Sequence, residues 1–142
     1  MAYALNLGAG TSNWAEAASL RHGIKWWLEN DCQYIEAESD SKLLVDCVNG
    51  TNSIPWNIFE EVTKLRKAME DNGYILKHVY RKGNQVADRL ANMGHEVSQS
   101  QIYLNFNELS EVVKGLMNTE RSGMPSTRIY KVKKSLIHVD PP

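Results

Sequence analysis

Apolar and polar residues along the first 94 positions follow two different spacings, which predict strands and helices in alternation. Residues 1–7 and residues 34–37 have the composition of short strands. Between them, a helix is predicted to begin at Asn13, a good capping residue, and to end near Glu29. Its apolar residues recur at i, i+4, i+7 and i+8, namely Leu20, Ile24, Trp27 and Leu28. The chain therefore opens with a strand, a helix and a second strand.

The stretch from residue 40 to residue 94 continues this alternation. The predicted elements are a helix over residues 43–48, a helix from Pro55 to Asn72, a strand over residues 74–80 and a helix from Asn84 to Gly94. Proline suits a first helical turn and glycine the position after a last one, so these residues set the boundaries. The order strand, helix, strand, helix, helix, strand, helix is typical of a layered α/β domain.

The pattern changes from Ser98 onward. Residues 98–101 are a polar linker, and Asn107 is predicted to cap a short amphipathic helix. Residues 129–139 mix β-forming residues with lysines, which indicates a basic tail. We therefore expect a domain over residues 1–96 and a C-terminal extension over residues 97–142.

Composition and charge exclude several classes. The chain has 142 residues, 42% of them hydrophobic, which suffices for one core. The formal net charge of −1 gives no overall basic field, so a nucleic acid would be held by a local patch or through metal ions. Cys32 and Cys47 lack CxxC spacing and are expected to be reduced residues of the core. The four histidines do not have the spacing of zinc ligands. Without a signal peptide or an apolar run long enough to span a bilayer, we expect a soluble intracellular protein, cytoplasmic or nuclear, with no membrane partner.

Asp40 lies between the end of the second predicted strand and the start of the predicted helix at residue 43. In α/β sheets, ligand sites form at the carboxyl ends of the strands, so Asp40 is a candidate site residue. The alternative is that Ser39 or Asp40 caps the helix by accepting backbone N–H groups. On this stretch alone, the capping interpretation is the stronger one.

Two further carboxylates have competing interpretations. Glu16 lies four residues before Leu20 and hence on the buried helix face, where it serves either as a helix-terminal cap or in a site. Asp88 lies one turn inside the last helix, too deep for a cap. Its ordinary interpretation is a partly exposed helix carboxylate.

Three motifs in the same order resemble the ribonuclease H type 1 family, and more closely the ribonuclease H-like domain of plant reverse-transcriptase and retroelement-derived proteins. They are Thr11–Ala17, Glu38–Leu43 and Asn84–Ala91, within a resemblance that covers roughly residues 2–94. The resemblance implies an α/β fold of three layers, in which helices flank a mixed central sheet. It also implies a hydrolase that cuts the RNA strand of RNA–DNA hybrids endonucleolytically with two Mg²⁺ (or Mn²⁺) ions.

The resemblance assigns roles to five residues. Glu16, Asp40 and Asp88 match three of the family's four metal-binding carboxylates, which are its catalytic residues. Ser12 and Asn13 match positions that contact the hybrid, although Asn is more typical at the position of Ser12.

The sequence also departs from the family. The family's first catalytic aspartate lies on an opening strand that precedes the matched region, and residues 1–15 contain no Asp or Glu. We expect an N-terminally truncated fold with the first two strands absent, and a chain that alone is inactive or impaired as a nuclease. The vacant place in the sheet predicts self-association through an exposed edge, strand swapping, or a shift of Ala2–Leu7 into the gap. The family's assisting histidine belongs in the loop before the last helix, but here that loop is only Arg81–Gly83. His78 is placed in the strand, where it is expected to pack or form hydrogen bonds rather than act in catalysis.

Three functions follow from these observations. The leading one is a ribonuclease H-like domain that binds nucleic acid of the RNA–DNA hybrid type. The second is a catalytically dead, retroelement-derived protein-interaction module whose acids serve as caps. An unrelated α/β binder of small molecules is disfavoured, because no Gly-rich phosphate loop joins a strand to a helix.

Overall fold

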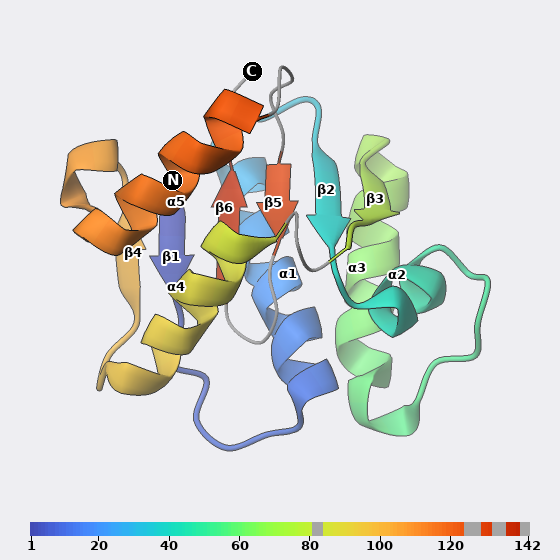
Figure 1. Ribbon diagram of the computed structural model, residues 1–142. Coiled ribbons are helices and arrows are strands. Elements are labelled where there is room, and N and C mark those ends of the chain that lie inside the picture. The colour runs from blue at the N-terminus through green and yellow to red at the C-terminus, as the bar shows by residue number, and fades with distance from the viewer. Residues whose placement is uncertain (81–83, 124–128, 132–135, 140–142) are drawn as a thin grey trace.

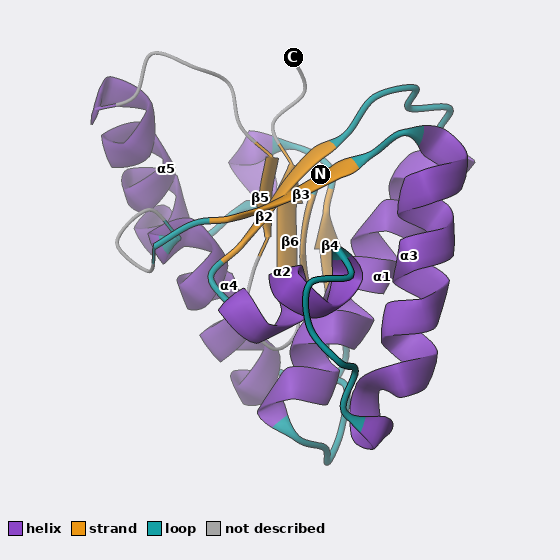
Figure 2. Cartoon of the chain, turned by 90° about the vertical axis from the view of Figure 1, so that its right-hand side faces the viewer, coloured by secondary structure: helices purple, strands orange, loops and turns teal. Residues whose placement is uncertain are grey.

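The computed structural model describes residues 1–80, 84–123, 129–131 and 136–139, and its strands lie in a central layer with helices on both sides (Figure 1; Figure 2). The strands are β1 (Ala2–Ala4), β2 (Glu36–Ser39), β3 (Ile75–His78), β4 (Gln101–Tyr103), β5 (Ile129–Lys131) and β6 (Leu136–Val139). The helices are α1 (Ser12–Glu29), α2 (Lys42–Val48), α3 (Phe59–Asn72), α4 (Gln85–Glu96) and α5 (Glu111–Gly123), with 3-10 helices η1 (Trp56–Ile58) and η3 (Phe106–Glu108). The predicted three-layer α/β architecture is confirmed.

The strands form a four-stranded sheet in the order β4-β1-β6-β5 and a two-stranded sheet of β2 and β3. β5 lies against β2, so the two sheets meet there. β1 is antiparallel to both β4 and β6, β5 is antiparallel to β6, and β2 is parallel to β3. The strand layer is therefore mixed, as predicted.

The place beside β2 is filled from the C-terminal part of the chain. The β5–β6 hairpin lies between β1 and β2, and β1 pairs with β6 rather than with β2. The predicted shift of Ala2–Leu7 into that place is therefore wrong. The backbone of β1 already has a partner on each side, so it has no reason to move.

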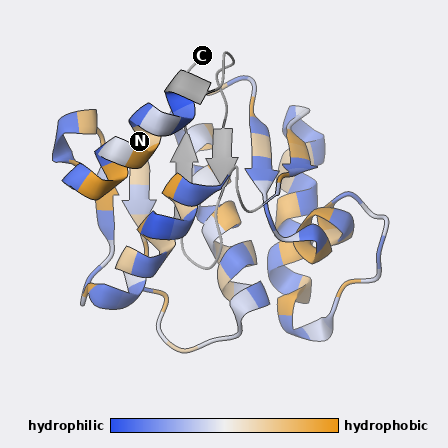
Figure 3. Ribbon diagram, viewed as in Figure 1, coloured by the Kyte–Doolittle hydropathy of each residue, from blue (hydrophilic) through white to orange (hydrophobic). Residues whose placement is uncertain are grey.

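Two main clusters of buried apolar side chains form the core. The first joins α1, α2, α3, β2 and β3, and the second joins β1, α4 and α5. Helices α3 and α4 show hydrophobic and hydrophilic residues on different sides, as amphipathic helices do (Figure 3). Ala2 and Ala4 face the second cluster, while Tyr3 between them points the other way and donates its O–H to the Ser19 carbonyl oxygen of α1 at 2.8 Å. β1 thus ties helices of both layers together.

The helix boundaries follow local chemistry. α1 begins at Ser12 because the Thr11 side chain caps it, accepting the Trp14 N–H at 3.2 Å. The prediction that Asn13 is the cap is therefore wrong by two residues. α3 ends as predicted, because Gly73 adopts a left-handed conformation with φ 65°. α4 runs to Glu96, past the stop predicted at Gly94.

The segment after residue 97 contributes to both sheet and helix layers. β4 begins at Gln101, where a linker was predicted, and it pairs with β1. The amphipathic helix predicted from Asn107 begins at Glu111, because the residues before it form η3. α5 packs on α4. In the part of the chain that the structure describes, no helix combines the length and apolar composition needed to cross a bilayer.

Candidate functional site

The carboxyl ends of β2 and β3 lie together, because the two strands are parallel with Ser39 opposite His78. The Val79 N–H donates to the Ser39 carbonyl oxygen at 2.9 Å, which holds the two ends in place. Asp40 follows β2 directly and is half-buried. β1 points in the same direction as β2, and α1 begins near this end of the strand layer (Figure 1). This end of the strand layer therefore holds Asp40 and the start of α1.

Asp40 is not the helix cap. Ser41 caps α2, since its hydroxyl oxygen accepts the Leu44 N–H at 3.3 Å. Ser39 also binds a backbone group, accepting the Ser41 N–H at 3.2 Å before the helix begins. The capping interpretation of Asp40 is therefore wrong, because a neighbouring serine performs that task.

Glu16 lies on the buried face of α1, as predicted, and is 5% exposed. With Thr11 as the cap, Glu16 is the fifth residue of the helix and lies beyond its first turn. The helix dipole acts mainly within the first turn, and the capping-box geometry needs a shorter spacing. The capping interpretation of Glu16 loses its basis, because a buried carboxylate this far from the helix end needs another reason for its position.

Asp88 is half-buried in the first turn of α4, and its N–H donates to the Asn84 carbonyl oxygen at 2.9 Å. Asn84 occupies the N-cap position, as predicted, but its side chain makes no capping hydrogen bond. That side chain is fully buried, and neither of its polar atoms has a partner among the described residues. Instead, the Val86 N–H donates to a carboxylate oxygen of Glu120 from α5 at 3.4 Å. The start of α4 is therefore stabilised by a residue far away in sequence.

The three carboxylates come from α1, the end of β2 and α4. Within the residues that the structure describes, no group of three or more His, Cys, Asp or Glu side chains could hold a metal ion. The described residues thus do not fit a complete two-metal centre. Metal binding by Glu16, Asp40 and Asp88 stays a prediction.

His78 is the last residue of β3, so its predicted place in the strand is confirmed. Its side chain is exposed and meets the Tyr80 ring edge-on, with 5.4 Å between ring centroids. The register places His78 opposite Ser39 and hence one residue from Asp40. The loop Arg81–Gly83 lies outside the described residues.

Ser12 and Asn13 open α1, where Ser12 is exposed and Asn13 is half-exposed. Ser12 lines an open pocket of about 340 Å³ between the β1–α1 loop and the end of α4, which contributes His95. The Asn57 side-chain amide donates to the Thr11 hydroxyl at 3.3 Å, so η1 lies against the start of α1. The two predicted substrate-contacting residues are therefore accessible, and η1 is their neighbour.

Sequence reasoning missed the exposed aromatic residues beside this helix start. Trp56 is 90% exposed and Phe59 is 57% exposed, whereas Ile58 between them is buried. The sequence did contain a signal for this. The apolar stripe of the third helix consists of Ile58 and the apolar residues that follow it at helical spacing, and neither Trp56 nor Phe59 falls on that stripe. Large aromatic residues off the buried face are candidates for contact with a ligand.

Comparisons with known proteins give one match. A family model described as reverse transcriptase-like matches residues 2–94, which include all five predicted site residues. No curated protein and no solved structure matches the chain.

Proposed function

The chain belongs to the reverse transcriptase-like family, an RNase H-like family, and on that premise we propose that it binds nucleic acid of the RNA–DNA hybrid type. The family match over residues 2–94 is the observation that carries this proposal. The three motifs found in the sequence further support kinship with ribonuclease H type 1 and an origin in a plant retroelement.

The start of α1 is the proposed contact with the nucleic acid. Ser12 and Asn13 present a hydroxyl and an amide there, which are suitable partners for a 2′-OH or a phosphate oxygen. The first N–H groups of the helix and its dipole also favour an anion at this end. Because the net charge is −1, we expect weak binding with few phosphate contacts and hence a shallow dependence on salt.

We further propose that Glu16, Asp40 and Asp88 are retained from the family's metal-binding carboxylates, with Mg²⁺ or Mn²⁺ as the ion. Support comes from the loss of the capping interpretations of Glu16 and Asp40. Since the described residues hold no complete metal-binding group, the chain alone is expected to cut hybrid weakly or not at all.

The test of binding uses the full chain and a fluorescently labelled RNA–DNA hybrid, with duplexes of DNA and RNA of the same sequence for comparison. Fluorescence anisotropy at a fixed salt concentration should show the hybrid bound more tightly than either duplex. The double variant Ser12→Ala, Asn13→Ala should weaken hybrid binding by about 1–3 kcal/mol, the usual cost of two or so polar contacts. Equal affinity for all three duplexes, or an unaffected variant, would contradict the proposed contact.

The metal proposal has a separate test. Titration with Mg²⁺ or Mn²⁺, followed residue by residue by NMR, should shift signals around Glu16, Asp40 and Asp88. The Asp40→Asn variant should lose that response. A response spread over the surface, or one unchanged by Asp40→Asn, would mean that these carboxylates bind no ion.

The second candidate is a protein-interaction module, favoured by exposed apolar side chains along β4, η3 and α5. They are Ile102, Leu104, Phe106 and Val112. Self-association through a sheet edge is a related proposal. The edge expected to be exposed was that of β2, but in the structure β5 lies beside β2. Light scattering after size exclusion, over a range of protein concentrations, would reveal a second copy. Absence of hybrid binding together with a concentration-dependent mass would favour this candidate.

A further inference from the structure

Two aromatic side chains stand out from the surface just before and at the start of α3. Trp56 is 90% exposed and Phe59 is 57% exposed, so most of each ring is in contact with solvent. Ile58 between them is only 1% exposed and anchors the turn in the core. The Ile58 N–H also donates to the Pro55 carbonyl oxygen at 3.1 Å. The two rings are therefore displayed on a turn that is held in place rather than on a loose loop.

This turn adjoins the proposed nucleic-acid contact. The Asn57 amide donates to the Thr11 hydroxyl at 3.3 Å, and Thr11 directly precedes Ser12. Figure 1 shows the start of α3 and the start of α1 side by side at the same end of the molecule. A nucleic acid seated on Ser12 and Asn13 would therefore pass close to Trp56.

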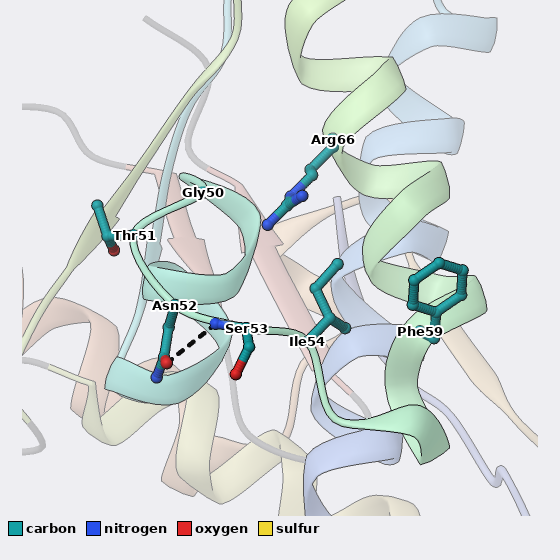
Figure 4. Close-up of a pocket in the computed structure, with 7 residues that line it drawn as sticks. All are labelled: Gly50, Thr51, Asn52, Ser53, Ile54, Phe59 and Arg66. Carbon is teal, nitrogen blue, oxygen red and sulfur yellow. Dashed lines mark hydrogen bonds between the residues drawn. The ribbon is translucent and has the colours of Figure 1, made fainter.

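An open hollow of about 600 Å³ continues the surface beyond Phe59. Its walls are α3, which contributes Phe59 and Arg66, and the loop over residues 50–54 (Figure 4). Asn52 and Ser53 place polar groups on it, and the Arg66 guanidinium, which donates to a backbone carbonyl of α2, extends toward the loop. An aromatic ring beside amide, hydroxyl and guanidinium groups is a combination that receives unpaired nucleobases, and Phe59 is the aromatic residue of this hollow.

The acidic residues nearby are neutralised within the protein. Glu60 forms an ion pair with Lys64 at 2.6 Å, and Glu61 forms one with Arg21 of α1. The hydrogen bond from Lys64 lowers the pKa of Glu60, which keeps this carboxylate ionised and paired. The first turn of α3 therefore presents balanced charges to an approaching phosphate.

We propose that Trp56 and Phe59 are a stacking platform for the unpaired bases of a single-stranded overhang, next to the duplex held at Ser12 and Asn13. This inference rests on the proposed binding of RNA–DNA hybrid and adds the part of the ligand that it would recognise. Stacking on aromatic rings tolerates any base, so the platform would select an unpaired strand rather than a sequence.

The test compares two labelled ligands, a blunt RNA–DNA hybrid and the same hybrid with a single-stranded overhang, bound to the full chain. Wild-type protein should bind the overhang ligand more tightly. Trp56→Ala should weaken binding of that ligand about tenfold, as loss of one stacked base does, and leave the blunt hybrid unchanged. Trp56→Phe should retain most of the affinity. Tyr34→Ala is the matched control, since Tyr34 is 60% exposed at the opposite end of β2 and should have no effect.

A second readout uses tryptophan emission. Of the four tryptophans, Trp56 is the most exposed, so stacking of a base should quench emission in the wild type and not in Trp56→Phe. Wild-type protein that binds neither ligand would refute the proposed function and this inference together. Hybrid binding that gains nothing from the overhang, or that Trp56→Ala leaves unchanged, would refute the platform alone and favour a protein contact at Trp56. Equal loss on both ligands would place Trp56 on the duplex and also overturn the proposal.

Discussion

The two main parts of the core are assembled in different ways. The β2 region, made of α1, α2, α3, β2 and β3, draws its buried side chains from one continuous run between Ala17 and Leu76. The β1 region, made of β1, β4, β5, β6, α4 and α5, joins elements from distant parts of the chain, since Ala2 pairs with both Tyr103 and His138. Ordering a long stretch of chain costs entropy before its contacts form. We therefore expect the β2 region to be the more robust of the two.

The largest expected effect comes from removing the β5–β6 hairpin. A chain ending at Gly123 would remove β6, to which β1 is paired, and β5, which lies against β2. Each buried backbone group of β1 left unpaired costs about 1–3 kcal/mol. The summed cost of a few such groups approaches the free energy of unfolding of a whole domain, which is about 5–15 kcal/mol. We expect the β1 region to lose its cooperative thermal transition, while α1 to α3 keep helical circular dichroism.

The control for this truncation is a chain ending at Val139, which keeps both strands of the hairpin. Hydrogen exchange of the β1 amides that face β6 reports on the same pairing, because Ala2–Ala4 lie opposite Leu136–His138. Their protection should disappear only in the shorter chain. An unchanged melting temperature after removal of the hairpin would show that the β1 region does not depend on it.

The same difference explains how much of the fold could be predicted. In the β2 region, helical spacing and local caps determine each element, so the apolar stripe of α1 and the end of α3 at Gly73 were predicted correctly. In the β1 region, a strand of three residues such as β4 carries no periodic signal and becomes a strand only through pairing with β1. The sequence of residues 129–139 alone does not indicate that β5 and β6 lie between β1 and β2. The neighbours and the register of a strand depend on the other strands of the sheet.

The candidate site follows the same division. Burial of Glu16 and the position of Asp40 at a strand end were predicted from local spacing. The interpretation of each as a cap failed because Thr11, five residues before Glu16, and Ser41, one residue after Asp40, are the residues placed to accept N–H groups. The proximity of Asn57 to Thr11 could not be predicted, because packing between helices is not visible in the spacing of either helix.

Helix caps offer a second test of the difference between the β1 and β2 regions, with a smaller expected change in the free energy of unfolding. In the β2 region, Thr11→Ala removes a formed cap and should lower the free energy of unfolding by about 1 kcal/mol. In the β1 region, Asn84 occupies a cap position without making the bond, and its buried amide has no partner among the described residues. Asn84→Ala should therefore cost well under 1 kcal/mol or even stabilise the protein, since it removes an unsatisfied polar group.

Chemical denaturation of the two cap variants beside wild type measures both changes, and Ser41→Ala is a further control with a formed cap. A loss in Asn84→Ala equal to that in Thr11→Ala would show that Asn84 makes a bond in solution. It would also remove the proposed difference between the helix starts of the two regions.

The smallest expected effect is a pH dependence where the regions meet. His22 of α1 packs edge-on against Tyr3 of β1, with 4.8 Å between ring centroids, and its Nε2 is buried without a hydrogen-bond partner among the described residues. Burial lowers the pKa of His22, and the positive charges of Lys25 and Arg21 lower it further, whereas Glu29 acts in the opposite direction. The folded state thus binds a proton less readily than the unfolded state.

The stability of the folded state should be complete above about pH 6.5, the pKa of the histidine in the unfolded state, and should fall as the pH drops below that value. The free energy of unfolding measured between pH 7.5 and pH 5 should therefore decline by about a few tenths of a kcal/mol more in wild type than in His22→Gln. Identical pH profiles would mean that the ring is hydrated in solution and that the contact between the two regions is looser than the structure shows.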